Sequence, residues 1–397
     1  MNIVVGVTAS ISAYKSLDLV NVLCKRGFEV RVVMTKNATQ FVAPLSFETL
    51  SKHKVICNMF DVGTPALAHI DLAKWCDVLI VAPASADFIA KAASGIADDF
   101  LTSMLLAFDG PVLVAPAMNT VMYEQKATRN NIDILKSYGY EIIEPSVGLL
   151  ACGDTGKGKL APMELLAFGV EKALLPQYLK GIKIIVTAGP TIAPVDPVRY
   201  ITNHSSGKMG MALAKTAALH GAEVTLVAGA TGLPTPNHVK RIDVKTTVDM
   251  LETLQSLLPA HDALIMAAAP ADYIPEKYSD DKIKKDEEVL SLTFKKNPDI
   301  LKSLKPLSIG KVMVGFAAES RDLLENAQRK LESKGLDFIV ANNIKGADSA
   351  FQSDYNIATL LFRDGRRIVV DRILKTALAE RILEEIYRII CSKEGSN

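Results

Sequence analysis

Short runs of apolar residues alternate with segments of helical period from the first residue of the chain. In the first half, the apolar runs occupy residues 2–8, 28–34, 77–83, 111–117 and 140–144. Runs of this length between helical segments are typical of parallel strands that are covered by helices on both faces. A helix expected over 162–175 closes this half. The pattern therefore predicts an α/β domain.

The same pattern restarts at Gly181. Its expected strands are 182–189, 222–228, 262–268, 311–317 and 337–341. A hairpin about Asp364-Gly365 should join 356–362 to 367–370, and an amphipathic helix should follow over 372–391. We therefore predict two tandem α/β domains, 1–178 and 181–397, with the boundary at about 176–181.

Composition narrows the range of ligands. The 45 Lys and Arg residues balance 44 Asp and Glu residues, so no global positive field would attract nucleic acid or anionic lipid. The apolar runs are shorter than the roughly 18 residues that a membrane span needs, and the N-terminus is typical of a strand and not of an export signal. We expect small-molecule ligands, no nucleic acid, no membrane and a cytoplasmic location.

The five cysteines are odd in number, widely spaced and without a CxxC pair. This usage opposes both a disulfide framework and a zinc site. Any functional cysteine should therefore be a lone, reduced thiol.

Polar residues follow the expected strands of the first half, among them Ser10, Thr35, Ser85 and Asn119. Because parallel strands end at one edge of a sheet, these residues should face one crevice. The segment 8–12 offers hydroxyls and helix N-terminal amides to a phosphate, although helix capping by Ser10 explains it equally well. No dinucleotide fingerprint stands there, which favours a mononucleotide such as FMN over NAD.

A glycine-rich segment, 148–158, contains Cys152. We expect a mobile loop that exposes this thiol, and a thiol is mostly protonated at pH 7 and can donate a proton in a closed site. His69 should begin a short helix, where a histidine is more often a structural hydrogen-bonding group than a base.

Five motifs of the first half resemble the flavin-dependent cysteine decarboxylases. They are His69 with Ile70-Asp71-Leu72, Pro83-Ala84-Ser85-Ala86, Ala97-Asp98-Asp99, Pro116-Ala117-Met118-Asn119 and Leu150-Ala151-Cys152-Gly153. The resemblance implies a flavodoxin-like domain in which FMN contacts Ser10, Thr35 and Ser85. It also implies His69 as the active-site base, Asn119 as the group that holds the substrate carboxylate, and Cys152 as the proton donor.

Asp87 departs from this family, which usually has asparagine at that position. A carboxylate near a flavin ring opposes the reduced, anionic form of the flavin. The contact made by this residue is therefore expected to differ from that of the family.

The second half has an anion-binding pattern of its own. Ser205-Ser206-Gly207-Lys208 precedes a helix that should end at His220-Gly221. Hydroxyls, a lysine and helix N-terminal amides suit an anion, although the segment is neither a Walker A loop nor a dinucleotide fingerprint. Helix capping again explains the two serines equally well. From Glu276 to Glu288, ten of thirteen residues are charged, which predicts a solvated flap.

The chain as a whole resembles the bacterial bifunctional phosphopantothenoylcysteine decarboxylase/phosphopantothenate-cysteine ligases of coenzyme A synthesis. In the second half the resemblance rests on residues 187–191, 196–210, 267–273, 282–285, 297–301 and 315–319. It implies a Rossmann-like ligase domain with an added β-hairpin, in which Asn203 contacts the activated acyl intermediate. The implied CTP site consists of Asp272, Lys282, Pro298, Asp299, Ile300, Leu301, Phe316, Lys330 and Lys334.

The resemblance implies two linked reactions. The ligase would join 4'-phosphopantothenate to cysteine through an acyl-cytidylate, and the decarboxylase would convert the product to 4'-phosphopantetheine. A divalent ion, Mg²⁺ or Mn²⁺, would share the phosphate charge, and the sequence identifies no ligands for it. The family also implies a homo-oligomer, a dodecamer-type assembly with trimeric and dimeric contacts.

The residue types alone do not distinguish CTP from ATP as the nucleotide. Two other classes of function are alternatives to the bifunctional enzyme. An NAD-dependent oxidoreductase is disfavoured by the missing fingerprint. A non-catalytic flavoprotein is disfavoured by the joint presence of His69, Asn119 and Cys152.

Overall fold

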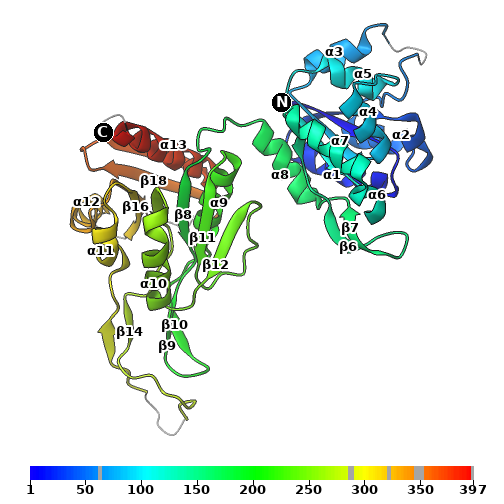
Figure 1. Cartoon of the computed structure of the whole chain (residues 1–397). Coiled ribbons are helices and arrows are strands. Elements are labelled where there is room, and N and C mark those ends of the chain that lie inside the picture. Colours follow the sequence, from blue (N-terminus) through cyan, green and yellow to red (C-terminus); the bar gives the residue numbers. More distant parts are fainter. Residues whose placement is uncertain (61–64, 285–289, 320–322, 344–352, 395–397) are drawn as a thin grey trace. The chain divides into compact units, whose positions relative to one another are not determined.

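The computed structural model describes residues 1–60, 65–284, 290–319, 323–343 and 353–394. The chain forms two compact units, Met1–Pro176 and Gln177–Asn397 (Figure 1). Among the described residues, no helix combines the length and the apolar character that crossing a bilayer requires.

The first unit is built on a five-stranded parallel sheet with the order β2-β1-β3-β4-β5. Its strands are β1 (Asn2–Val7), β2 (Glu29–Met34), β3 (Val78–Ala84), β4 (Val112–Pro116) and β5 (Glu141–Ile142). This is the flavodoxin-like order, in which ligands bind where the strand order reverses, between β1 and β3. The predicted fold class is confirmed for this half.

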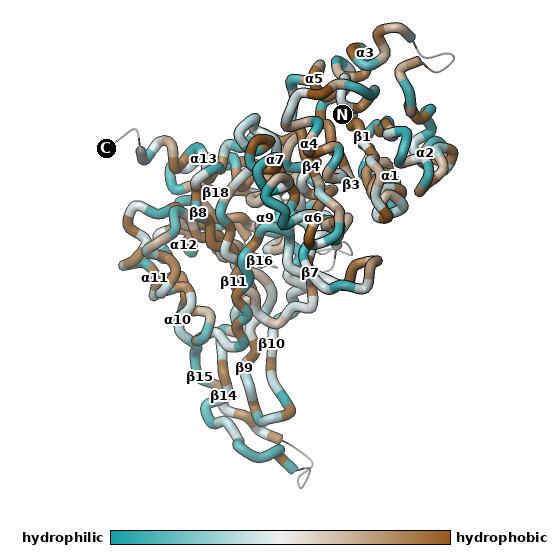
Figure 2. Tube along the Cα trace, turned by 45° about the vertical axis from the view of Figure 1, so that its right-hand side comes forward, coloured by the Kyte–Doolittle hydropathy of each residue, from teal (hydrophilic) through white to brown (hydrophobic). Residues whose placement is uncertain are grey.

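Helices cover both faces of this sheet. They are η1 (Ile11–Tyr14), α1 (Lys15–Lys25), η2 (Lys36–Gln40), α2 (Pro44–Ser51), α3 (Ala68–Trp75), α4 (Ala86–Ser94), α5 (Phe100–Ala107), α6 (Thr120–Glu124), α7 (Lys126–Ser137) and α8 (Met163–Ala173). Alternate strand residues point to opposite faces, so Ile3 and Val5 join one buried cluster and Val4 joins the other. Figure 2 shows hydrophobic residues along these strands, which explains why they appear as continuous apolar runs in the sequence.

The glycine-rich segment 148–158, which we expected as a loop, is partly strand. It contributes to an antiparallel hairpin, β6 (Ser146–Leu149) and β7 (Thr155–Lys159). Gly158 has φ +155°, and a Cβ there would lie 2.2 Å from the Met118 carbonyl oxygen. A Cβ on Gly156 would lie 2.4 Å from Thr120 Oγ1. The glycines therefore allow close packing against the segment after β4.

The second unit contains an eight-stranded sheet with the order β12-β11-β8-β13-β16-β17-β18-β19. Its strands are β8 (Lys183–Ala188), β11 (Glu223–Ala228), β12 (Val239–Asp243), β13 (Ala263–Met266), β16 (Val312–Glu319), β17 (Phe338–Asn343), β18 (Tyr355–Phe362) and β19 (Arg367–Leu374). The first six in the sheet are parallel and the last two form an antiparallel hairpin. This is the Rossmann order with the predicted hairpin added.

The helices of this unit are α9 (Lys208–Leu219), α10 (Thr247–Leu257), η3 (Leu258–Ala260), α11 (Ile300–Leu304), η4 (Lys305–Leu307), α12 (Leu323–Lys334) and α13 (Lys375–Glu394). The last strand extends to Leu374 and not only to residue 370, so α13 begins three residues after the expected 372. The strand expected at 140–144 is, in contrast, shorter than expected, and β12 was not expected at all.

Two further hairpins were not predicted, and together we call them the arm. They are β9 (Ile192–Pro194) with β10 (Tyr200–Thr202), and β14 (Tyr273–Pro275) with β15 (Phe294–Lys296). Figure 1 shows both extending from the same end of the sheet of this unit. The Asp196 carboxylate joins them, because it accepts the backbone N–H groups of Val198, Arg199 and Ile283.

Tyr178 packs in the second unit, although the sequence pattern put it at the end of the first domain. Its ring centroid lies 4.5 Å from that of His220 and 5.3 Å from that of Tyr387. Leu179 is fully buried beside it in the chain. The compact core of the second unit therefore begins before Gly181.

Candidate active sites

Three predicted flavin contacts follow neighbouring strands of the first sheet. Ser10, Thr35 and Ser85 are the N-cap residues of η1, η2 and α4, which come after β1, β2 and β3. Ser10 Oγ accepts the Ser12 N–H at 3.3 Å, and Ser85 Oγ accepts the Phe88 N–H at 3.2 Å. The capping role that the sequence left open for Ser10 is thus present. The three side chains lie at one edge of the sheet, on both sides of its switch point.

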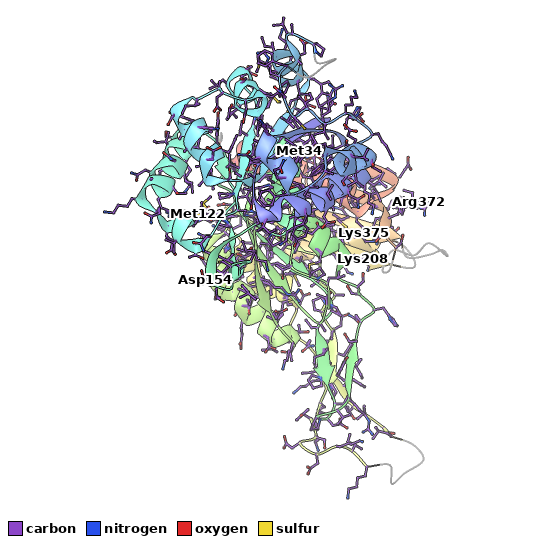
Figure 3. The ribbon with its side chains drawn as sticks, turned by 90° about the vertical axis from the view of Figure 1, so that its right-hand side faces the viewer. Met34, Met122, Asp154, Lys208, Arg372 and Lys375 are labelled. Carbon is purple, nitrogen blue, oxygen red and sulfur yellow. The ribbon has the colours of Figure 1, made fainter. Side chains whose placement is uncertain are left out.

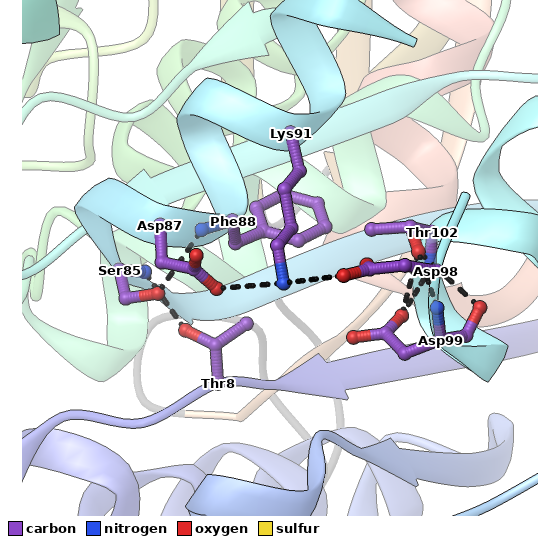
Figure 4. A network of polar contacts seen from close by, with 8 residues as sticks. All are labelled: Thr8, Ser85, Asp87, Phe88, Lys91, Asp98, Asp99 and Thr102. Carbon is purple, nitrogen blue, oxygen red and sulfur yellow. Dashed lines mark hydrogen bonds and ion pairs between the residues drawn. The ribbon is translucent and has the colours of Figure 1, made fainter. Parts of the chain in front are cut away.

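A polar network ties the ends of β1 and β3 together (Figure 4). The Thr8 hydroxyl donates to the Pro83 carbonyl at 2.8 Å and accepts the Ser85 N–H at 2.8 Å. These bonds fix the two strand ends on either side of the switch point. The edge of the candidate flavin site is therefore held by buried backbone contacts.

The unusual Asp87 belongs to the same network. Its carboxylate lies 3.2 Å from the ammonium of Lys91, which also lies 3.1 Å from Asp98 (Figure 4). Burial alone would lower the pKa of Lys91, but the hydrogen bonds that its ammonium donates to Asp98 and Asp87 raise this pKa overall. Lys91 therefore stays charged and offsets part of the negative charge that replaces the usual asparagine.

Cys152 and Asn119 meet at the turn of the β6–β7 hairpin. Asn119 Nδ2 donates to Cys152 Sγ at 3.3 Å, and the thiol donates to Asp154 Oδ2 at 3.3 Å. Asn119 Nδ2 also lies 3.4 Å from Asp154 Oδ2. Asp154 was missed by the sequence analysis, although it follows Cys152 by two residues.

His69 lies on α3, as predicted. Its Nδ1 atom is buried without a hydrogen-bond partner among the described residues, and its ring meets Phe100 edge-on at 6.3 Å. The hydroxyl of Thr120, next to Asn119, is also buried without a partner in the described part of the chain. Buried polar atoms are rarely left unpaired, so these two fit a site that a ligand or another chain completes.

The second unit has a cavity of about 660 Å³ at the edge of its sheet. Every predicted nucleotide residue except Lys282 lines it, namely Asp272, Pro298, Asp299, Ile300, Leu301, Phe316, Lys330 and Lys334. Ser205-Ser206-Gly207-Lys208, at the start of α9, lines the same cavity. The segments that the sequence analysis took from separate parts of the chain therefore share one site.

Local bonds hold the walls of this cavity. Asp299 caps α11 by accepting the Lys302 N–H, and its other oxygen lies 3.2 Å from Lys334 Nζ. Asn297 Nδ2 donates to the Ala271 carbonyl at 2.7 Å, and the Ala271 N–H donates to Thr191 Oγ1 at 2.9 Å. The loop after β13 is therefore fixed from two sides.

Asn203 and Lys282 lie outside this cavity. Asn203 lines a neighbouring cavity of about 290 Å³, which shares Ser205 and Ser206 with the larger one. Its amide donates to the carbonyl of Pro270, which lines the larger cavity, at 2.9 Å. Lys282 is exposed within the arm. Of the predicted flap 276–288, residues 285–288 lie outside the described residues.

Lys375 and Asn356 also line the larger cavity and were missed as site residues. The sequence analysis assigned their segments only to the added hairpin and the last helix. The helix was expected from residue 372, so only the structure shows that Lys375 is its first residue. A positive charge is unfavourable at that position unless another group compensates for it.

Within the described ranges, no cluster of three or more His, Cys, Asp or Glu side chains could hold a metal ion.

Comparisons with known proteins match both halves. Residues 1–174 match the Flavoprotein family, and residues 179–390 match the DNA/pantothenate metabolism flavoprotein C-terminal domain. The coenzyme A biosynthesis bifunctional protein CoaBC of Vibrio vulnificus (strain YJ016) is 44% identical over 393 residues, which are 98% of this chain and 98% of that protein. The protein of the same name from Bacillus subtilis (strain 168) is 42% identical over 390 residues, 97% of this chain and 96% of that protein.

Among solved structures, the C-terminal domain of a coenzyme A biosynthesis bifunctional protein CoaBC is 36% identical. It aligns with 54% of this chain and 99% of its own length, with a TM-score of 0.48.

Proposed function

The chain belongs to the family of coenzyme A biosynthesis bifunctional proteins, with a flavoprotein decarboxylase domain and a ligase domain, and from this premise we propose its substrates and site residues. The second unit joins 4'-phosphopantothenate to cysteine at the expense of CTP. The first unit then decarboxylates 4'-phosphopantothenoylcysteine to 4'-phosphopantetheine with the help of FMN.

For the first unit, the proposal is supported most by the contact of Cys152 with Asn119. The bound FMN would supply reversible hydride acceptance, and the residues at the strand ends, Ser10, Thr35 and Ser85, would hold it. The Asn119 amide would bind the substrate carboxylate, and the Cys152 thiol would protonate the carbon from which CO₂ has left. His69 would act as the base at the start of the reaction.

For the second unit, the 660 Å³ cavity has the size of a typical small-molecule site. The nucleotide would lie among Asp272, Phe316 and the 298–301 turn, with Lys330 and Lys334 near its phosphates. Attack of the phosphopantothenate carboxylate on the α-phosphate would give an acyl-cytidylate and pyrophosphate. Asn203 would hold this intermediate while the cysteine amine displaces the nucleotide. Mg²⁺ or Mn²⁺ and the lysines would offset the developing charge.

Asn203 and Lys282 offer a direct test of the ligase assignment. Lys282→Gln should slow pyrophosphate release itself, because the flap lysine would close over the polyphosphate. Asn203→Asp should still release pyrophosphate but form little amide. Pyrophosphate and amide are followed separately in a single turnover, with and without cysteine, and Lys284→Gln is the control. Equal loss of both signals in both variants would reject the division of roles.

We also propose a cytoplasmic homo-oligomer of the dodecamer type. Exposed apolar residues near the Cys152 turn, Val121, Val147 and Leu149, support a contact there with another chain. Light scattering at micromolar concentration should give a mass several times the 42.9 kDa of one chain. A mass equal to that of one chain would reject the assembly.

A yellow preparation with a flavin spectrum would support the FMN assignment. Parallel assays with CTP and ATP, each with phosphopantothenate and cysteine, decide the nucleotide. Faster amide formation with ATP than with CTP would overturn the CTP proposal.

A further inference from the structure

Two lysines line the large cavity from the first position of a helix. Lys208 begins α9 and Lys375 begins α13. Figure 3 shows the two side chains close together on the second unit. The N-terminus of a helix carries a partial positive charge, so each lysine adds positive charge to an end that is already positive. This wall of the cavity therefore suits an anion.

The carboxylate of Asp354 contacts Lys208, although the two residues are far apart in the sequence. Asp354 Oδ1 lies 2.7 Å from Lys208 Nζ. The Lys375 ammonium donates to the carbonyls of Ser353 and Tyr355, the two residues on either side of Asp354. Lys375 thus holds the backbone that carries Asp354. Hydrogen bonding and charge from Lys208 lower the pKa of Asp354, so its carboxylate is ionised at neutral pH.

Asn356 gives independent support for a ligand on this wall. Its side chain is only 4% exposed and lines the cavity, yet its Oδ1 has no hydrogen-bond partner among the described residues. Asn342, on the neighbouring strand, also lines the cavity, and its buried Oδ1 likewise has no partner among the described residues. Buried polar atoms in proteins are almost always bonded, and both oxygens are acceptors, so a donor group of a ligand or an ordered water completes these two.

We propose that the Asp354 carboxylate occupies the position on Lys208 that a phosphate of the nucleotide takes on binding. A bound polyphosphate therefore replaces this carboxylate. Lys375 is a positioning residue that fixes Asp354 through the two flanking carbonyls and adds a second positive charge to the same wall. The inference rests on the proposed nucleotide-dependent ligase function and assigns these three residues to its phosphate end.

The exposure of the pair suits such an exchange. The Asp354 side chain is 72% exposed and Lys208 is 35% exposed, and ion pairs at such positions are weak. A polyphosphate brings several negative charges and can also accept backbone N–H groups at the start of α9. Burial, and then the charge of Lys208, lower the pKa of Lys375, so an added anion stabilises both ammonium groups together.

The test uses the full chain and two probes, inorganic pyrophosphate and CTP. Each probe is titrated into the protein in the presence of Mg²⁺, and its affinity is measured by calorimetry. Asp354→Asn removes the competing carboxylate, so pyrophosphate should bind about two- to fivefold more tightly. Lys375→Met should weaken pyrophosphate binding about tenfold or more. If Asp354 and Lys375 had only structural roles, both substitutions would weaken pyrophosphate binding. Opposite changes in affinity are therefore specific to the proposal.

Matched controls come from the same elements. Asp364→Asn breaks an exposed ion pair with Arg366 in the same hairpin, and Lys393→Met removes a lysine at the other end of α13. Both should leave pyrophosphate affinity unchanged. If Lys375→Met does not fold, the pyrophosphate affinity of Asp354→Asn by itself tests the proposal.

Unchanged or weaker pyrophosphate binding by Asp354→Asn overturns the proposal, as does undetectable pyrophosphate binding by every variant. If pyrophosphate responds as expected while CTP does not bind, the exchange stands and the proposed CTP function fails. If CTP binds and amide forms while Asp354→Asn leaves the pyrophosphate affinity unchanged, the proposed ligase function stands and the proposed exchange of carboxylate for phosphate fails.

Discussion

The sulfur of Cys152 takes part in two hydrogen bonds of opposite sense. It accepts an N–H of the Asn119 amide and donates its own proton to Asp154. This arrangement fixes the direction of the S–H bond and keeps the proton next to the group that would bind the substrate carboxylate. A carboxylate substrate at Asn119 would displace Asp154 from that amide, which leaves the thiol beside the reacting carbon.

Replacing this thiol tests its role as a proton donor. In Cys152→Ser, CO₂ release should continue while formation of 4'-phosphopantetheine falls by about a hundredfold or more, because a hydroxyl is a far weaker acid. Labelled CO₂ and product are measured in the same reaction. The control is Cys391→Ser, which changes another exposed cysteine. Normal product formation by Cys152→Ser would remove this thiol from the mechanism.

At the scale of the element, the β6–β7 hairpin is positioned by a glycine. Gly158→Ala would put a Cβ 2.2 Å from the Met118 carbonyl oxygen, at φ +155°. We expect a loss of about 2 kcal/mol or more in the free energy of unfolding, with decarboxylase activity lost because Asn119 and Cys152 separate. Calorimetry and product formation give the two readouts.

Gly148→Ala in the paired strand is the matched control. Its nearest contact would be Lys159 Cδ at 3.5 Å, which is an ordinary distance. Equal stability of the two variants would contradict the proposed packing of the hairpin.

The arm should loosen in acid. Burial opposes ionisation of Asp196, but the N–H groups of Val198, Arg199 and Ile283, and the Arg199 charge, lower its pKa overall. A lowered pKa in the folded state stabilises the arm above the ordinary Asp value of about 3.9, and this stabilisation is lost as the pH falls through the folded value. Hydrogen exchange in the arm should therefore rise below that pH. The arm of Asp196→Asn should exchange rapidly already at pH 7, and slow exchange there would refute the role of the carboxylate.

Burial decides which elements could be predicted from the sequence. Strands such as β1 and β3 are buried on both faces and appear as continuous apolar runs. The arm strands β10 and β15 are exposed throughout, so their sequences lack any strand pattern. Only their pairing partners make them strands, and those partners lie elsewhere in the sequence.

The same limit applies to the sites. Asn119 and Cys152 belong to short motifs, so a resemblance was enough to find them. Lys208 and Asp354 are 146 positions apart and meet only in the folded chain. No local pattern distinguishes an aspartate that will pair with a cavity lysine from one that faces solvent. Lys375 was missed for the same reason, because the helix was expected from residue 372 and only the folded chain places this lysine at the first helical position.

At the scale of the whole molecule, the chain should be divided before Gln177. A fragment 177–397 keeps Tyr178 and Leu179, whereas 181–397 lacks both. Because Leu179 is fully buried, the shorter fragment should lose about 2–5 kcal/mol of unfolding free energy. Urea unfolding of both fragments measures this difference. Equal stability would show that the second unit begins at Gly181 after all.

The two units are expected to act in sequence, since the product of the ligase is the substrate of the decarboxylase. The most direct measurement supplies the purified chain with 4'-phosphopantothenate, CTP, Mg²⁺ and cysteine labelled at its carboxyl carbon. We expect that one pyrophosphate and one labelled CO₂ appear for each 4'-phosphopantetheine, and that omitting CTP abolishes both. Release of labelled CO₂ without CTP, or amide that accumulates without any CO₂, would contradict this expectation.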